Sequence, residues 1–436
     1  MLQRNHVFIL STVIIAVGCG SALEPSTLHP DDQHEAGRPD GGSDSASDGG
    51  ARAAAAQMND LSVLYPMGGG EDDHALYIAA DEPGRGVAFL PKTIWSEAGG
   101  DETSDGREGG PPPVLYNELR VVAFRFDTCF AQPADVADQA SCDNQLRLSF
   151  QPLIKANGIV TARDSAVHVF YKQSRAELVD AVKSMIALRL ANNGEGSLGP
   201  LSPHPILVRQ GLGGAMASGI RSLLAKYASP SKIVRIARFK SSDPNAAEAW
   251  PFKGFDISAA GKGAAMALPA LAPNSDGQPN TLVSAATNFG FDGVIIPAST
   301  SADNLATLIS LPAMEKATAA ERVRAYEAGL RIENPRMHSP NTIDCATCHL
   351  ADPALVTLGE RRFGLSRNGN PNAFTPSATR VASDDMRRTA TPPELASGQT
   401  PNLHMFSYLG TRPGIGQRVI NETADVMAYI NGVLLR

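Results

Sequence analysis

Apolar and polar residues alternate in several short runs between residues 61 and 300, and this pattern predicts β-strands. The runs are 75–79, 86–90, 114–126, 145–153, 166–171, 233–239 and 293–296. The alternation is clearest at 122–126 and 146–150, where every second residue is large and apolar. We expect these two strands to be half-buried, with one face toward a core.

Two helices are predicted in the same half of the chain. Ser174 and Glu177 have the spacing of a capping box, which predicts a helix that begins there and ends near Gly194. A second helix is expected at about 215–227, where apolar residues recur at helical spacing. Strands and helices together predict an α+β domain of unknown role over residues 59–300.

From about residue 301 the pattern becomes helical. Thr318 and Glu321 form another capping box, and apolar residues recur at helical spacing from 417 to 434. The fold class expected for the whole chain is therefore α+β, with a strand-rich N-terminal domain followed by an all-α domain at 301–436.

The first residues are typical of an export signal. Arg4 precedes an apolar run at 7–17, which is too short to span a bilayer. Small residues lead to Cys19, an arrangement that resembles the lipobox of bacterial lipoproteins, in which the cysteine is acylated and becomes the first residue. The resemblance implies a signal peptide at 1–18 and a membrane anchor at Cys19, placing the protein on the periplasmic side of the cell envelope as an outer-membrane lipoprotein. A plain secretory signal is the alternative.

Residues 19–58 are rich in Ser, Gly, Ala and acidic residues and contain few large apolar ones, which predicts a disordered tether. The formal net charge of the chain is −7, and no basic block is present. This composition argues against nucleic acid as a partner.

The motif with the clearest chemistry is Cys-x-x-Cys-His at Cys345, Cys348 and His349. Two thiols at this spacing reach the two vinyl groups of one haem, and the next histidine binds the iron from below. A redox dithiol would need a strand before the motif and a helix opening at the first cysteine. A zinc site would need further Cys or His ligands, of which His338 is the nearest. We therefore predict one covalent haem c.

The last part of the chain resembles class I c-type cytochromes. Residues 424–430 (ADVMAYI) are similar to the closing helix of that family, and the order of helix, attachment motif, loops and terminal helix is the same over about residues 315–436. The resemblance implies a sixth iron ligand, usually methionine, before the terminal helix. Met405 has this position, and His404, Met386 and the absence of a protein ligand are the alternatives.

Three arginines and one histidine are weaker candidates for functional contacts. Arg361, Arg362 and Arg367 follow the motif and are candidates for contacts with the haem propionates, although arginines in such positions are more often solvated. His168 falls on a predicted strand, where a packed or solvated face explains it better than metal ligation.

Two cysteines remain in the N-terminal half. Cys129 and Cys142 lie between the predicted strands 114–126 and 145–153. In an oxidising compartment a disulfide between them would close the connecting loop and add roughly 3 kcal/mol of stability. Two free buried thiols are the alternative.

The sequence thus predicts an exported, lipid-anchored monohaem c-type cytochrome that exchanges single electrons with a redox protein partner. No catalytic residue is expected in such a carrier. The alternatives are a haem-dependent oxidoreductase or peroxidase-like enzyme, and a haem-containing binding or sensing lipoprotein at the surface.

Overall fold

The structure is a computed structural model of the chain. The residues that it describes are 54–98, 116–128, 144–240, 249–265, 280–286, 290–294, 305–338, 343, 345–376, 386 and 403–435. The predicted signal peptide with Cys19, and the predicted disulfide between Cys129 and Cys142, lie outside these ranges. Among the described residues, no helix combines the length and the apolar character needed to cross a bilayer.

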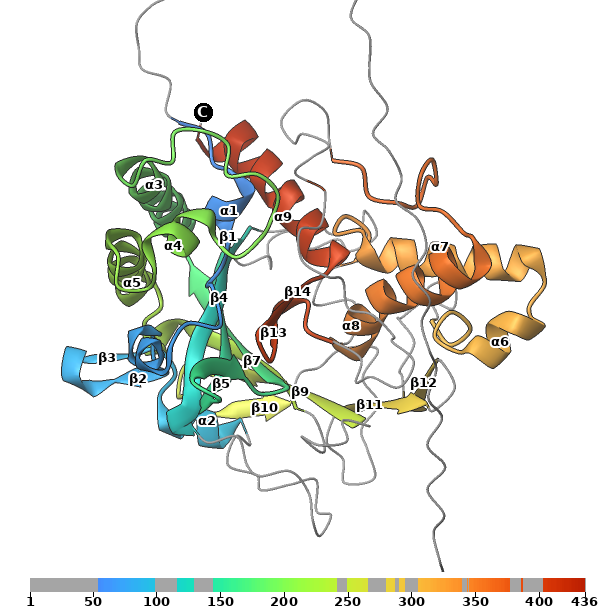
Figure 1. The fold of residues 1–436 in the computed structure, drawn as a ribbon, viewed down its shortest axis with the longest axis horizontal. Helices are drawn as coiled ribbons and strands as arrows, with labels where there is room; N and C mark the ends of the chain where they lie inside the picture. Colours follow the sequence, from blue (N-terminus) through green and yellow to red (C-terminus); the bar gives the residue numbers. More distant parts are fainter. Residues whose placement is uncertain are drawn as a thin grey trace, which may run out of the picture. The chain divides into compact units, whose positions relative to one another are not determined.

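A large antiparallel sheet runs through the described part of the chain (Figure 1). Eight strands follow one another along it in the order β1 (Ser62–Leu64), β4 (Leu119–Asp127), β5 (Asn144–Ala156), β7 (Ser165–Gln173), β8 (Ile233–Lys240), β9 (Ala249–Ile257), β11 (Asn280–Ala286) and β12 (Gly290–Val294). Two more strands pair alongside, β6 (Ile159–Ala162) with β5 and β10 (Gly263–Ala265) with β9. Phe126 lies opposite Leu146, so β4 and β5 pair in the register that their alternation allows.

The strand predictions at 145–153, 166–171 and 233–239 are confirmed, and β4 begins at Leu119 rather than at residue 114. The prediction at 75–79 is wrong, because this segment begins in the 3-10 helix η1 (Glu71–Leu76). The run at 86–90 contributes only β3 (Val87–Ala88), which pairs with β2 (Asp81–Glu82). Strand β9 was not predicted, since Pro251 and Gly254 interrupt its pattern.

One face of the sheet carries α3 (Arg175–Ala191) and α5 (Ala215–Tyr227), two helices that the sequence predicted. The Ser174 hydroxyl accepts from the Glu177 amide at 3.2 Å, and the Glu177 carboxylate accepts from the Ser174 amide at 2.9 Å. This reciprocal cap satisfies two backbone donors that the first turn leaves unpaired. Three shorter helices complete this half: α1 (Met58–Leu61), α2 (Lys92–Glu97) and α4 (Pro205–Gln210).

Several helices and a hairpin follow residue 305. They are α6 (Leu311–Lys316), α7 (Ala319–Glu333), α8 (Cys345–Ala354) continued by the π-helix η7 (Leu355–Arg362), the hairpin β13 (Phe406–Leu409) and β14 (Arg412–Ile415), and α9 (Gln417–Tyr429) continued by the π-helix η9 (Ile430–Leu434). The capping box at Thr318 and Glu321 begins α7, as the sequence predicted. The predicted terminal helix at 417–434 is formed by α9 and η9.

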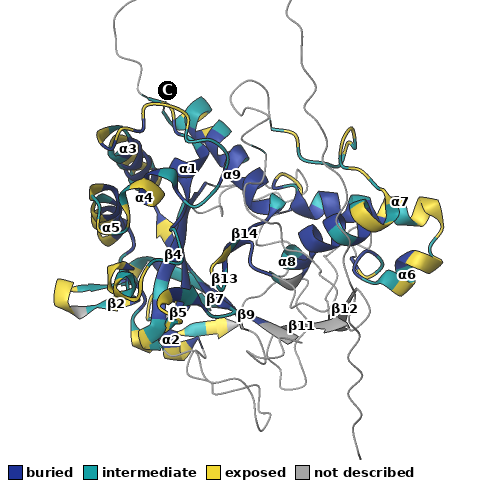
Figure 2. Cartoon of the chain, viewed as in Figure 1, coloured by how far each residue is buried: buried dark blue, intermediate teal, exposed yellow. Residues whose placement is uncertain are grey.

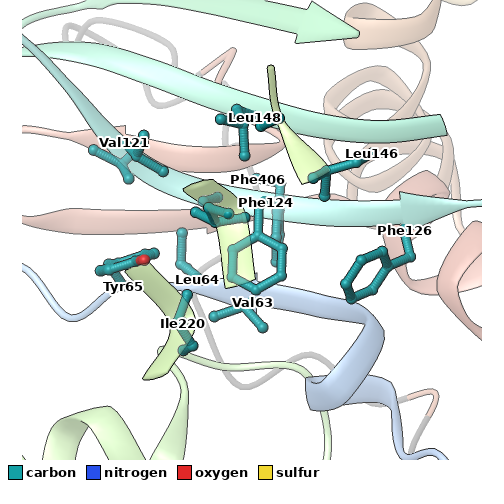
Figure 3. Packing of buried hydrophobic residues seen from close by; sticks show 14 of the residues in the cluster. Val63, Leu64, Tyr65, Val121, Phe124, Phe126, Leu146, Leu148, Ile220 and Phe406 are labelled. Atoms are coloured by element: carbon teal, nitrogen blue, oxygen red, sulfur yellow. The ribbon is translucent and has the colours of Figure 1, made fainter. Parts of the chain in front are cut away.

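The prediction of a strand-rich domain followed by an all-α cytochrome c-like domain is wrong. The chain is built on one large antiparallel sheet, and its last part contains a β-hairpin. One buried cluster joins Leu148 of β5 with Phe406 of the hairpin and Val426 of α9, and Figure 3 shows part of this packing. A second cluster joins Phe252 of β9 with Leu350 of α8. The sheet and the later helices therefore share their cores.

The strands β4 and β5 are buried on both faces, rather than half-buried as the alternation indicated. α8, α9 and the hairpin contact the face opposite α3 and α5. In Figure 2, α9 and the strands beside it are buried, whereas exposed residues gather on α3, α5 and α6.

Gln151 of β5 attaches the hairpin to the sheet, since it donates to the Tyr408 carbonyl and accepts from the Tyr408 amide, both at 2.8 Å. This second face is unusual because it buries polar and charged side chains.

The stability of the fold should depend on pH through His204. This imidazole is fully buried at the start of α4, neither ring nitrogen has a hydrogen bond, and burial lowers its pKa to about 4. Because the unfolded chain takes up this proton at a higher pH, stability should fall between about pH 6.5 and pH 4, by about 3 kcal/mol in total. Denaturant titrations of wild type and His204→Leu at pH 7.5 and pH 4.5 measure the effect. The prediction fails if both proteins lose the same stability between the two pH values.

Candidate haem site

A cavity lies between the second face of the sheet and the elements that follow residue 343. The sheet contributes Arg125 from β4, Arg147 and Ser149 from β5, His168 and Phe170 from β7, and Arg235 and Ala237 from β8. The opposite walls are Ile343, Cys345, Cys348, His349, Met405, Phe406, Arg418, Val419 and Glu422. The cavity has a volume of about 110 Å³, and all the space between its walls, with the solvent at its mouth included, is about 830 Å³. A macrocycle therefore enters only if the walls separate and one of its edges stays at the mouth.

Helix α8 places the three motif side chains together. The helix begins at Cys345, and Cys348 and His349 lie three and four residues later, so they share its face with Cys345. All three are partly exposed and line the cavity, and neither cysteine is in a disulfide. Pro353 lies inside the helix, which then widens into the π-helix η7. Irregular helix of this kind occurs often at functional sites.

His349 is held as a neutral imidazole by a hydrogen bond at one of its two ring nitrogens. Its Nδ1 lies 2.6 Å from the Leu403 carbonyl oxygen, which can only accept, so the proton is on Nδ1 and Nε2 keeps its lone pair. Burial lowers the pKa of His349 to about 4, against the opposing effect of the Leu403 hydrogen bond. The rings of Phe239 and Phe252 lie 5.4 and 5.2 Å from the imidazole. A neutral histidine fixed through its other nitrogen is the usual form of a metal ligand.

Met405 lines the same cavity and is 5 % exposed. The hairpin holds its backbone, since the Met405 carbonyl accepts from the Gly416 amide at 2.7 Å. A Cβ atom on Gly416 would lie 2.6 Å from the Met405 methyl carbon, so the glycine leaves room for the end of this side chain. The cavity thus combines the three motif residues with the thioether that the family resemblance implies.

The two alternative ligands are differently placed. His404 has protein partners at both ring nitrogens, with Ser407 Oγ 2.7 Å from Nδ1 and Asp164 Oδ1 2.9 Å from Nε2. Met386 lines another pocket, together with Glu333 and Asn421. Of the three candidates for the sixth ligand, Met405 alone lines the cavity that contains the motif.

The arginines considered for the propionates do not line the cavity. Arg362 pairs with Glu315 at 3.2 Å, and Arg367 pairs with Glu333 at 3.0 Å. Arg361 is an exposed residue of η7. The positive charges at the cavity come instead from the sheet and from α9.

His168 lines the cavity from β7, whereas the sequence favoured a packed or solvated face for this residue. Its Nδ1 lies 3.0 Å from the hydroxyl of Ser149 on the neighbouring strand. Burial, followed by the charge of Arg147, lowers the pKa of His168 well below its usual range. Its place on a predicted strand could not show that it lines a cavity, because the opposite wall is formed by residues far away in the chain.

A buried charge network forms one wall. Glu422 of α9 accepts from Arg418 at 2.6 Å and contacts Arg125 of β4 at 2.9 Å. Asp127 contacts Arg147 at 2.8 Å. Burial alone would raise the pKa of Glu422, but Arg418, Arg125 and Arg147 lower it to about 2, so the carboxylate stays ionised at neutral pH. The network connects the sheet to the last helix across the cavity.

Asp352 joins the motif helix to α9. Its carboxylate accepts from the Gln417 amide at 3.0 Å and so caps α9, where the N-cap residue Gly416 has no side chain to do so. Asp352→Ala should cost about 1 kcal/mol of stability, the usual cost of losing a cap. Denaturant unfolding measures the loss, and the comparison is Glu321→Ala, which removes the carboxylate that accepts from the Thr318 amide in the capping box of α7. A change below about 0.3 kcal/mol for Asp352→Ala would contradict this role.

Two further observations bear on the redox dithiol and the zinc site, the other interpretations of the Cys-x-x-Cys-His motif. A helix that opens at the first cysteine is also a feature of redox dithiols, whereas the described residues before it, 334–338 and 343, contain a turn and a bend and no strand. Within the described ranges, no group of three or more His, Cys, Asp or Glu residues is placed to hold a metal ion. Comparison of the chain with family models, curated proteins and solved structures gave no match.

Proposed function

We propose that the chain is an exported, lipid-anchored monohaem c-type cytochrome, with haem attached at Cys345 and Cys348 and iron bound by His349. The observation that carries the proposal is the common placement of three motif side chains and Met405 around one cavity. The haem would supply a one-electron couple between ferric and ferrous iron. The residues of the chain would attach the haem through two thiols and supply a neutral imidazole to its iron.

Met405 is our proposed sixth ligand. A thioether favours ferrous iron and so raises the reduction potential. His404 fits this role less well, because binding iron would break its contact with Ser407 or with Asp164. The redox partner would reach the haem edge at the mouth of the cavity, and the lipid at Cys19 would keep the protein at the membrane.

The test is whether pigment stays covalently bound. The full chain is produced in a host that matures c-type cytochromes, denatured, and washed with acid acetone. We expect retained red pigment in the wild type and none in Cys345→Ser/Cys348→Ser, and the Cys19→Ser variant should leave the membrane fraction. Pigment that washes out of the wild type would refute the proposal.

A peroxidase-like enzyme is the second candidate, and the polar wall of the cavity is the observation that favours it. His168 and Arg147 are groups that can transfer a proton or stabilise charge beside a haem. Such chemistry needs an open iron position, so the ferric protein should be high-spin and should change its spectrum with peroxide. A low-spin spectrum that peroxide leaves unchanged would exclude it.

A further inference from the structure

We infer that the sheet binds the carboxylates of the haem through Arg125 and Arg147. The inference rests on the proposed function and assigns the N-terminal half of the chain a part in cofactor binding. The chemical class of the ligand is a porphyrin dicarboxylate.

The two arginines lie directly opposite each other on β4 and β5, and both line the cavity. Their side chains are 4 % and 12 % exposed. Like charges at directly opposed positions of a sheet destabilise it, and burial increases the cost. Two buried guanidinium groups in register therefore indicate that this position binds negative charge.

The carboxylates of the buried network balance only part of the positive charge of the arginines. Arg125, Arg147 and Arg418 carry three positive charges, whereas Glu422 and Asp127 carry two negative charges, which leaves a surplus of one. A dicarboxylate with one group in the network and the other at the mouth would balance this surplus.

The arginines also have unused hydrogen-bond donors. Nε and Nη2 of Arg125 and Nε of Arg147 are buried and make no hydrogen bond among the described residues. The nearest ionic contact of Arg125 Nη2 is to Asp127 at 3.5 Å, too long for a good hydrogen bond. A guanidinium group presents its donors as a planar fork that matches a carboxylate. Buried donors without acceptors are costly, so a ligand carboxylate at this wall would be strongly favoured.

Arg235 differs, although it lines the same cavity. Its Nε donates to Asp256 at 2.7 Å, and both side chains are partly exposed. Its charge is therefore already paired outside the buried network. This makes Arg235 a matched control for Arg147.

The experiment separates carboxylate binding from porphyrin binding. In the full chain with Cys345→Ala/Cys348→Ala, haem binds reversibly, and its affinity is measured by absorbance titration. The probes are iron protoporphyrin IX, its dimethyl ester and succinate. We expect the diacid to bind roughly ten- to a hundredfold more tightly than the ester, the range given by one charge-assisted hydrogen bond.

The variants then locate the carboxylates. Arg147→Met should weaken the diacid about tenfold or more and leave the ester within about twofold, whereas Arg235→Met should change neither. Arg147→Lys keeps the positive charge, so it tests the same contact if Arg147→Met does not fold, and it should lose an intermediate amount of affinity for the diacid. Circular dichroism checks the fold of each variant. In the covalent holoprotein, Arg147→Lys should also shift the propionate bending bands in the resonance Raman spectrum.

Three outcomes would overturn the inference. Equal affinity for diacid and ester means that the carboxylates do not contact the arginines. Succinate binding that depends on Arg147 means that the site takes a free dicarboxylate instead. If neither porphyrin binds, the proposed function fails as well, so the two failures are distinguishable.

Discussion

Replacing Glu422 with leucine should lower the free energy of unfolding by roughly 3–5 kcal/mol, because it leaves buried charges without a partner. Glu422 is 3 % exposed and is the carboxylate shared by Arg418 and Arg125, at 2.6 and 2.9 Å. Removing it would leave both guanidinium groups inside the protein without this acceptor. Chemical denaturation at pH 7 measures the loss.

An exposed ion pair provides the comparison. Glu315 contacts Arg362 at 3.2 Å with both side chains at least half exposed, so Glu315→Leu should change stability by less than about 1 kcal/mol. If Glu422→Leu and Glu315→Leu have equal effects, the buried network is not what holds α9 to the sheet.

The stability that Glu422 contributes should fall as the pH is lowered. The pKa of Glu422 is lowered to about 2, below that of the unfolded chain, so its contribution is complete above about pH 4.5 and is lost as the pH falls toward 2. Glu422→Gln should remove this part of the acid sensitivity. An unchanged acid-unfolding profile in Glu422→Gln would contradict the assignment.

Replacing Met405 with alanine should lower the reduction potential of the holoprotein by roughly 0.1–0.3 V, a part of the range of about 0.8 V that axial ligands control. The far-red band of the ferric protein, which reports methionine ligation in class I c-type cytochromes, should disappear if the proposed haem is bound. Gly416→Ala should weaken the same band, because its Cβ would lie 2.6 Å from the Met405 methyl carbon. Spectroelectrochemical titration measures potential and band together.

Met386→Ala is the control for this effect, since Met386 lines a different pocket. It should leave potential and band unchanged. If Met386→Ala or His404→Ala removes the band and Met405→Ala does not, the ligand has been assigned to the wrong residue.

Local signals in the sequence predicted local structure well. The capping boxes at Ser174 and Thr318 begin α3 and α7, because such a cap depends only on residues three positions apart. The spacing of Cys345, Cys348 and His349 likewise predicted that these side chains would lie together, and α8 places them on one face.

The far wall of the cavity could not be predicted in this way. Arg125 and Ser149 occupy the positions between the apolar residues of β4 and β5, where alternation indicates solvent. They are buried because α9 and the hairpin, more than 250 residues later in the chain, cover that face. No periodicity within a strand can report such a distant contact. The same contact explains why no separate all-α domain forms.

The last helix, α9 with its continuation η9, is hydrogen-bonded to residues 56 and 62 near the start of the described chain. The Asn431 side chain donates to the Ala56 carbonyl and accepts from the Ala56 amide, both at 2.9 Å, and the hydroxyls of Ser62 and Thr423 lie 2.7 Å apart. Arg418 and Glu422 of the same helix line the cavity. Release of either residues 56–64 or the last helix would thus loosen a wall of the cavity. Amide protons of residues 56–64 and of α9 should therefore exchange with solvent in one cooperative opening, and a bound cofactor should slow both sets equally.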